Sequence, residues 1–294
     1  MKAQRVFFDT NAFRYFGIAF ENVSLAAELQ EKILISPLSA FEVFAQLSDE
    51  DETKADAVLR QIRAIRNWTN PKHAVLLPWP DDMIRSLWSQ KDVQDEDFRK
   101  RMEDSFNVCL KADSLAHLKE AALQQKQTME EFKFNMAHDF KNMVDDLKAQ
   151  QGKPGKKKAK PVDTTEVWFH RIAKRARADP TSKTISEVQA LFGAYHEFEQ
   201  EKLRRALVSP DYNPLSHANQ NDIIDAEQLV YLGDRSLSIV TSDKGLKSKV
   251  TKSDQTTRVT LAPPQDLVNP EEAEAVIRSV LTCVWDSLES TQFL

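Results

Sequence analysis

The sequence predicts an α/β fold in which a central parallel sheet is interrupted by a large, mostly helical insertion. Short apolar segments that favour β-strands lie within the first 77 residues and again after residue 236. Helical segments separate these strands at both ends of the chain, a rhythm typical of parallel sheets. The stretch from Pro80 to about Ala149 is long, charged and poor in Gly and Pro, so it favours helices. One sheet built from both ends of the chain accounts for these observations best.

These observations divide the chain into three parts. Residues 1–80 are expected to form the first half of the core, residues 81–218 the helical insertion, and residues 219–294 the second half with a C-terminal helix. Within the insertion, residues 152–161 (GKPGKKKAKP) predict a loop, because like charges repel and both Pro and Gly break helices. Strands are expected at 5–8, 33–36, 74–77, 237–241 and 258–262. Helices are expected at about 10–31, 37–47, 53–67, 164–178, 184–208, 221–232, 242–250 and 270–290.

The first strand and the helix after it show the local signals most clearly. The strand is short and apolar and ends at Asp9, and Thr10 or Asn11 is expected to cap the following helix. Gly17 lies within that helix and predicts a kink.

The insertion carries one apolar stripe at helical spacing. Its members recur at steps of three and four residues and are Met129, Phe132, Met136, Phe140 and Met143. We expect this stripe to pack in the core or against another helix, with a ligand or partner groove as the alternative.

The composition is that of an ordinary globular protein, with 41% hydrophobic and 29% charged residues. The net charge of −5 argues against a uniformly basic nucleic-acid-binding protein, but the charge is unevenly distributed. Residues 151–178 contain nine basic and two acidic residues, a net charge of +7, which leaves −12 for the remainder. This asymmetry indicates one basic segment in an otherwise acidic chain.

Cysteine usage and hydropathy bear on the compartment. Cys109 and Cys283 have no CxxC spacing, so they imply neither a disulfide framework nor a zinc site. The N-terminal segment turns polar after three apolar residues, and no apolar run approaches the roughly 18 residues of a membrane span. We therefore expect a cytoplasmic protein that does not contact membranes.

Four acidic residues each lie where a strand or helix is expected to end toward one shared edge of the sheet: Asp9, Glu42, Asp225 and Asp243. In parallel sheets, ligands bind at the carboxyl ends of the strands. At an effective dielectric constant near 20, two unit charges about 4 Å apart repel by roughly 4 kcal/mol. A divalent cation that prefers hard oxygen ligands, Mg²⁺ or Mn²⁺, is the usual reason for such convergence. The pattern therefore indicates a metal-dependent phosphodiesterase.

Each of these acids also has an ordinary explanation by itself. Asp9 and Asp243 are suited to cap the helices that follow them, and a single Glu in a helix is usually solvated. Asp222 lies three residues before Asp225 on the same helical face, so it is either an extra ligand or a helix cap. The coincidence of four acids at matching positions favours the functional interpretation.

Three segments of the chain resemble the PIN-domain nucleases: VFFDTN at 6–11, SAFEVFAQL at 39–47, and the pair DIIDAEQLVYLG and LSIVTSD within 222–243. In that family an Asp ends the first strand within a DTN-like motif, and a Glu lies in the helix after the second strand. A further Asp begins a helix that leads into a strand ending in T-x-D. The resemblance covers about 140 to 150 residues at the two ends of the chain, does not extend over roughly 81–218, and implies a PIN-like three-layer fold.

The resemblance also implies an activity, the hydrolysis of RNA phosphodiester bonds with Mg²⁺ or Mn²⁺. Carried over residue by residue, it makes Asp9, Asp225 and Asp243 metal ligands. Glu42 completes the site directly or through water. The number of bound ions, one or two, is left open. Supporting polar residues carried over in the same way are Asn11, Thr241 and Ser242.

A strongly acidic site needs basic residues elsewhere to hold a nucleic-acid backbone. The basic segment is the candidate, with a solvated loop as the alternative. Trp168 and Phe169, beside Arg171, are suited to base stacking, although core packing is the favoured explanation. The residues expected to contact phosphates are Lys153, Lys156, Lys157, Lys158, Lys160, Arg171, Lys174 and Arg175.

The first hypothesis is thus an endoribonuclease, acting as a toxin or defence effector, with an inhibitory or regulatory protein or a second copy as partner. The alternatives are a structure-specific DNA nuclease and a non-catalytic PIN-like scaffold that binds RNA or protein. A phosphatase of the haloacid dehalogenase type is disfavoured, because that class needs an acid where this chain has Asn11. The sequence contains no HExxH, G-x-S-x-G or P-loop motif.

Overall fold

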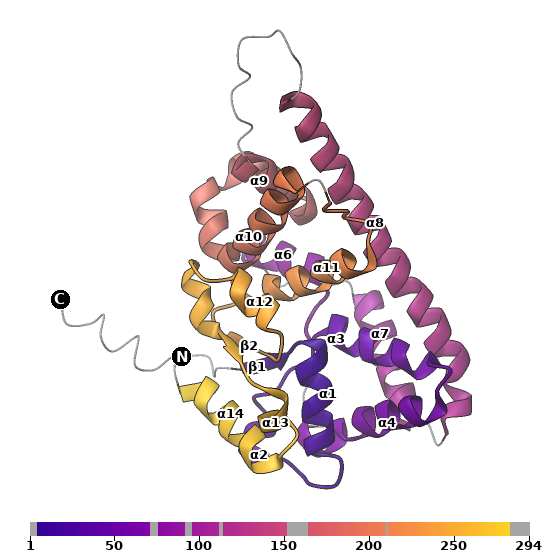
Figure 1. The fold of residues 1–294 in the computed structure, drawn as a ribbon. Helices are drawn as coiled ribbons and strands as arrows, with labels where there is room; N and C mark the ends of the chain where they lie inside the picture. Colours follow the sequence, from indigo (N-terminus) through magenta and orange to yellow (C-terminus); the bar gives the residue numbers. More distant parts are fainter. Residues whose placement is uncertain are drawn as a thin grey trace, which may run out of the picture.

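Figure 1 shows a mostly helical molecule built around a small parallel sheet. The computed structural model describes residues 5–70, 76–91, 96–111, 114–151, 164–209 and 211–282. Strands β1 (Arg5–Phe8), β2 (Leu237–Thr241) and β3 (Val259–Leu261) form the sheet in the order β1-β2-β3, and both pairings are parallel. The predicted α/β fold with a central parallel sheet is confirmed, and both ends of the chain contribute strands.

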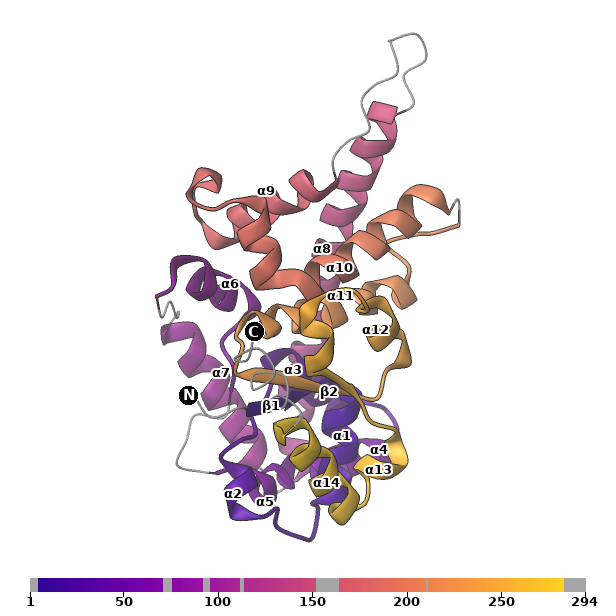
Figure 2. The same cartoon turned by 90° about the vertical axis from the view of Figure 1, so that its left-hand side faces the viewer.

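The sheet is buried on both faces, which explains why two thirds of the residues of β1 and β2 are apolar. Phe8 and Val240 belong to one hydrophobic cluster, which also contains residues of the first helix and the last described helix. Phe7 and Ile239 belong to a second cluster, shared with helices of the insertion. Since successive side chains of a strand point to opposite faces, the two clusters lie on the two sides of the sheet. Figure 2 shows helices on both sides.

The second predicted strand is wrong. It is reduced to single parallel bridges, of Ile33 with Val6 and of Ile35 with Leu76. Pro37 begins a helix directly after this stretch, and a proline lacks the N–H that a strand ladder needs. The bridges nevertheless extend the parallel sheet on the β1 side. Positions 74 and 75 of the third predicted strand lie outside the described residues.

The core helices flank this sheet. The first half contains α1 (Thr10–Ala19), α2 (Ala27–Gln30), α3 (Pro37–Ala45), η1 (Gln46–Ser48), α4 (Glu52–Arg63) and α5 (Ile65–Trp68). The second half contains α11 (His217–Leu229), η4 (Val230–Gly233), α12 (Lys244–Lys249), η5 (Asp254–Arg258), α13 (Pro264–Leu267) and α14 (Pro270–Thr282). Of the helix predicted for 270–290, residues 283–290 lie outside the described chain.

The helix predicted over 10–31 is broken in the structure, and this prediction is wrong in its second half. Helix α1 ends at Ala19, and only the short α2 follows. The polar side chains of Asn22 and Ser24 compete for backbone hydrogen bonds, which favours a turn over a helix here. Gly17 does not mark the break, because it lies inside α1. A Cβ at Gly17 would lie 3.0 Å from the Gln61 carbonyl oxygen, so this glycine permits the close approach of α4.

The insertion is helical as predicted. It contains α6 (Pro80–Ser89), α7 (Glu96–Lys111), η2 (Leu115–His117), α8 (Lys119–Gln151), α9 (Thr164–Ala176), η3 (Pro180–Ser182) and α10 (Ile185–Val208). Helix α8 is 33 residues long and runs along one side of the molecule, past α3, α11 and α10 (Figure 1). The basic loop predicted at 152–161 lies outside the described residues.

The apolar stripe of α8 packs against other helices, as predicted. Met129 is buried beside Leu38 of α3 and Ile224 of α11, and Phe132 packs against the same cluster. Farther along, Phe140 is buried in a separate cluster formed with α10. The insertion therefore lies directly against α3 and α11, the helices that carry Glu42 and Asp225.

The structure also bears on the predicted absence of a membrane span. In the segments that it describes, none of the helices combines the length and apolarity needed to cross a lipid bilayer. This agrees with the hydropathy of the sequence.

Candidate functional site

Asp9 and Asp243 lie at the same edge of the sheet. Strands β1 and β2 are adjacent and parallel, with Phe8 opposite Val240, so the segments after them leave the sheet together. The backbone N–H of Asp9 donates to the Val240 carbonyl at 3.0 Å. Asp9 is the N-cap of α1 and Asp243 is the N-cap of α12. The carboxyl edge, where parallel sheets bind ligands, thus carries two of the predicted acids.

Thr241, the last residue of β2, joins these two acids. Its hydroxyl donates to the Oδ2 atom of Asp9 and accepts the backbone N–H of Asp243 at 2.9 Å. The other carboxylate oxygen of Asp9 accepts the Ala12 N–H at 2.6 Å. Burial raises the pKa of Asp9 to about 6, and Asp243 raises it as well, while Thr241 and Ala12 act in the opposite direction. Thr241 therefore connects Asp9 and Asp243 through its hydroxyl group.

Asp225 lies in α11 and is half-buried. Its pKa is raised well above the usual value, first by burial and then by the charges of Asp243 and Asp9. Glu42 raises it further, and only the ammonium of Lys249 lowers it. The structure thus brings all four predicted acids within electrostatic reach of one another. Among the described residues, none donates a hydrogen bond to the Asp225 carboxylate.

Glu42 projects from α3 and is held by two side chains. The Thr10 hydroxyl donates to its Oε2 atom at 2.5 Å, and the Lys133 ammonium lies 2.5 Å from Oε1. The helix itself is fixed by Ser39, whose hydroxyl donates to the Phe8 carbonyl at 2.9 Å. The position of Glu42 is therefore set from β1, α1 and α8 together.

Asp222 is not a helix cap, because α11 begins at His217 with Ser216 as its N-cap. Its carboxylate instead pairs with Lys249 at 2.6 Å and lies 3.7 Å from Arg205. These two cations more than offset the charge of Asp222, which distinguishes it from Asp225 three residues later.

Ser242 and Asn11, the other two residues expected to support the site, differ in their contacts. The backbone N–H of Ser242 hydrogen-bonds to Asp9, so this residue contributes through its main chain. Asn11 is exposed on the first turn of α1, and no described residue hydrogen-bonds to its side chain. Thr10, expected as a cap together with Asn11, contacts Glu42 instead, since Asp9 caps the helix.

The donor set fits a hard divalent cation chemically, because it consists of carboxylate and hydroxyl oxygens. Within the described segments, however, no three or more His, Cys, Asp and Glu side chains stand in an arrangement that could hold a metal ion. The carboxylate oxygens are turned toward protein donors instead: Ala12 and Thr241 for Asp9, Gly245 for Asp243. Ligation by these acids therefore requires their side chains to turn away from those donors.

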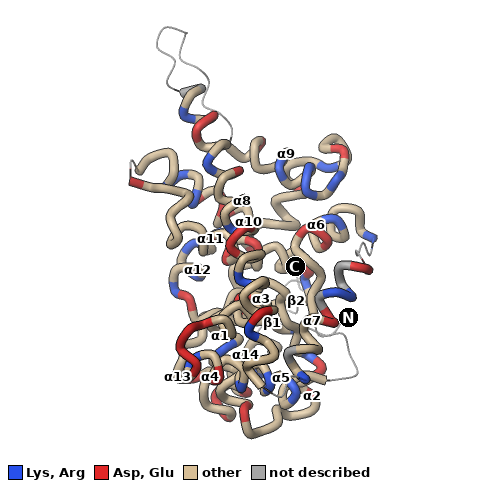
Figure 3. Tube along the Cα trace, turned by 90° about the vertical axis from the view of Figure 1, so that its right-hand side faces the viewer, with Lys and Arg blue, Asp and Glu red and all other residues tan. Residues whose placement is uncertain are grey.

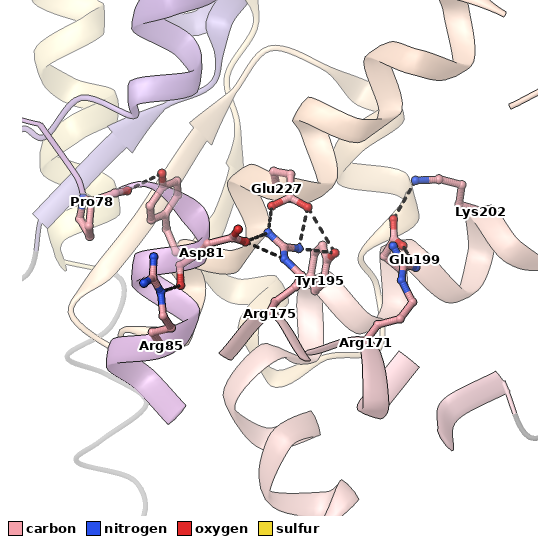
Figure 4. A network of polar contacts seen from close by, with 10 residues as sticks. Pro78, Asp81, Arg85, Arg171, Arg175, Tyr195, Glu199, Lys202 and Glu227 are labelled. Atoms are coloured by element: carbon pink, nitrogen blue, oxygen red, sulfur yellow. Dashed lines mark hydrogen bonds and ion pairs between the residues drawn. The ribbon is translucent and has the colours of Figure 1, made fainter. Parts of the chain in front are cut away.

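Two residues predicted to contact nucleic acid belong to a buried network instead (Figure 4). Arg175 forms a bidentate pair with Glu227 at 2.8 and 2.5 Å and also contacts Asp81 at 2.8 Å. Arg171 donates to Glu199 at 3.2 Å, and Lys202 lies 2.8 Å from the other oxygen of Glu199. Both arginines are therefore engaged in contacts within the protein rather than available to phosphates.

The remaining predicted contacts are partly outside the described chain. Lys174 is exposed on α9, where Figure 3 shows several basic positions. Trp168 and Phe169 are buried, in agreement with core packing rather than base stacking. The lysines outside the described residues are Lys153, Lys156, Lys157, Lys158 and Lys160.

A polar groove that the sequence did not predict lies between α10 and the α12–η5 segment. Its volume is about 1150 Å³, and its walls carry the cations Arg204, Arg205, Lys249 and Lys252 together with the acids Glu197, Glu201 and Asp254. Lys249 and Arg205 both pair with Asp222, so the groove begins one helical turn from Asp225. It is a groove of mixed charge next to the acidic site.

No family model, curated protein or solved structure matches the chain. The functional conclusion therefore depends on the residues of the chain itself. Among these, Lys133 was missed at the level of the sequence, although a signal exists. It lies four residues after Met129 and four before Ala137, on the face of α8 that is otherwise buried and apolar.

Proposed function

We propose that the protein is a metal-dependent endoribonuclease that binds Mg²⁺ or Mn²⁺ through Asp9, Asp225 and Asp243. Glu42 completes the proposed site directly or through a water molecule. The observation that supports this most strongly is the surroundings of Asp225. This carboxylate is half-buried, has no hydrogen-bond donor among the described residues, and is faced by three other acids. A cation at this position relieves both the burial and the repulsion.

In the proposed mechanism, the acids provide oxygen ligands and their neighbours hold those ligands in place. A bound divalent cation supplies a water of lowered pKa and polarises the phosphoryl oxygen. Thr241 orients Asp9 and, through the Asp243 backbone, the start of α12. Thr10 and Lys133 fix the Glu42 carboxylate, which in this mechanism accepts a hydrogen bond from the attacking water.

The proposed substrate is RNA, a preference that comes from the resemblance to PIN-domain nucleases. The groove beside α12 offers Lys252 as a cation for sequence-independent phosphate contacts, whereas Arg204, Arg205 and Lys249 first have to leave their acidic partners. The order of events is then binding in the groove, followed by placement of one phosphate at the sheet edge.

The test is cleavage of labelled single-stranded RNA and DNA in Mg²⁺, Mn²⁺ or EDTA by wild type and Asp225→Asn. We expect RNA cleavage with either metal, none in EDTA, and a loss of more than about 100-fold in the variant. That figure follows because even the outer partners of metal ligands usually contribute 10- to 100-fold. Asp145→Asn is the matched control, since Asp145 is exposed on α8 and pairs only with Lys141. Equal cleavage by wild type and Asp225→Asn would show that Asp225 is not part of the active site. Preferred cleavage of DNA would show that the substrate is DNA and not RNA.

A further inference from the structure

Lys133 stands out among the inward-facing residues of α8. Met129, Ala137, Phe140 and Val144 lie on the same face, and each is at most 4% exposed. A charged residue in such a stripe normally needs a partner, because burial of an unpaired charge is strongly unfavourable. The partner of Lys133 is a residue of the proposed metal site.

The contacts of Lys133 are short and largely shielded from solvent. Its ammonium lies 2.5 Å from the Oε1 atom of Glu42 and 3.2 Å from the Oδ1 atom of Asn221. The side chains of Lys133 and Glu42 are only 16% and 17% exposed. The insertion thereby places a fixed positive charge against one of the four acids.

The charges around the site show what this ammonium changes. When ionised, the four acids Asp9, Glu42, Asp225 and Asp243 carry four negative charges. Lys133 adds one positive charge. Asp222 and the two cations that contact it, Lys249 and Arg205, together add one more. A net charge of −2 is left, which one divalent cation balances and two would exceed.

We propose that Lys133 takes the place of a second divalent cation beside Glu42, so that the site binds one divalent cation per chain. This inference rests on the proposed function, because it assumes that the acids bind a metal. Lys133 acts through Glu42 as a positioning residue: it occupies the oxygen that a second ion would need and holds the carboxylate toward the site. A lysine that only attached α8 to α3 would leave the number of bound ions unchanged.

The experiment counts Mn²⁺ ions bound per full-length chain by equilibrium dialysis, with electron paramagnetic resonance to report spin coupling between neighbouring ions. We expect one ion in wild type, with no coupled signal. Lys133→Met removes the charge but keeps the aliphatic stem, and we expect two ions with a coupled signal. Lys133→Arg keeps the charge and should bind one.

The controls separate the possible failures. Lys141→Met is the matched control, since Lys141 lies on the same helix and pairs with the exposed Asp145; it should bind one ion. Lys133→Gln, which retains a donor for Glu42, replaces the methionine variant if that variant does not fold. Two ions in wild type, or one in folded Lys133→Met or Lys133→Gln, would overturn the inference while leaving the metal site in place. No bound ion in wild type would overturn the proposed function as well.

Discussion

Two acids of α11, only two residues apart, lie in opposite surroundings. Glu227 is 1% exposed and forms a bidentate pair with Arg175, with the Tyr195 hydroxyl 3.3 Å away. Asp225 faces Asp243, Asp9 and Glu42, and among the described residues no donor hydrogen-bonds to it. One helix thus carries a carboxylate that is fully paired and a carboxylate that is surrounded by like charge.

The difference separates an acid that stabilises the fold from an acid that has the surroundings expected for the proposed site. The charges around Glu227 belong to α6, α9 and α10, so their pairing attaches the insertion to the core. Glu199, in the same network, shows the electrostatic consequence: burial opposes its ionisation, but Lys202 and Arg171 lower its pKa to about 2. The sheet-edge acids behave in the reverse way, since burial raises the pKa of Asp9 to about 6. Such acids are neutralised either by a proton, which their raised pKa favours, or by the cation proposed above.

The largest effect should come from breaking the paired region. Arg175→Met leaves Glu227 buried without its partner, which destabilises proteins by about 3–5 kcal/mol in comparable cases. Urea denaturation of wild type and variant measures this difference. A loss below about 1 kcal/mol would show that the network contributes little and that the comparison with Asp225 is not informative.

The second prediction compares how the stability contributions of Asp9, at the sheet edge, and Glu199, in the paired region, depend on pH. The pKa of Asp9 rises on folding from 3.8 to about 6, so its protonated form is favoured in the folded state. Its contribution to stability is complete below about pH 4 and lost as the pH rises through 6, a change of about 3 kcal/mol. Replacement by Asn should therefore become more stabilising relative to wild type between pH 4 and 7.

Glu199 should show the opposite sign. Its pKa falls on folding from 4.5 to about 2, so its contribution is present above pH 4.5 and lost as the pH falls through 2. Denaturation curves of Asp9→Asn, Glu199→Gln and wild type, measured from about pH 2 to pH 7, give the difference in stability between each variant and wild type. If both differences changed with pH in the same direction, the assignment of different roles would be contradicted.

The third prediction concerns metal and stability in the absence of any substrate. Mn²⁺ at about 100 times its dissociation constant should stabilise wild type by about 2.7 kcal/mol. Asp225→Asn should be more stable than wild type in EDTA, since it removes a repelled charge, and should gain little from Mn²⁺. Thermal melting with Mn²⁺ or EDTA measures both effects. A variant that gains as much as wild type would place the ion elsewhere.

The smallest effect is expected at an exposed pair with the same geometry as Arg175 and Glu227. Arg204 contacts both oxygens of Glu201 at 2.8 Å, but its side chain is 63% exposed. Solvent screens such pairs, so Arg204→Met should leave the urea midpoint unchanged within experimental error. A clear loss would mean that bidentate geometry, and not burial, sets the importance of these pairs.

Local sequence was sufficient for the elements that build the site. The apolar runs of β1 and β2, each followed by an Asp, predicted both strands and the edge at which their acids meet. The periodic stripe of α8 predicted its packing. The second strand, predicted for 33–36, is present only as single bridges at Ile33 and Ile35, while the helix start predicted at Pro37 is confirmed.

Tertiary pairing explains most of what the sequence did not predict. Arg175 and Glu227 are 52 residues apart, and nothing local identifies them as partners. A basic segment therefore suggested phosphate contacts at arginines that the fold uses internally. Lys133 was detectable as a charge on an apolar face, but its partner Glu42 lies 91 residues earlier. The polar groove is likewise formed by residues from α10 and the α12–η5 segment, which the chain brings together only after folding.

The pairing of β1 with β2 also has a consequence for biosynthesis. The bond between Asp9 and Thr241 spans 232 residues, so the ribosome makes the first acid long before the last. At about 5–20 residues per second, roughly 12 to 47 seconds separate the synthesis of the two ends of the site. For most of that interval the emerging chain lacks Asp225, and until the end of it the chain lacks Asp243. If the protein cleaves RNA, its own messenger and ribosome are spared until the last of the four acids has been made.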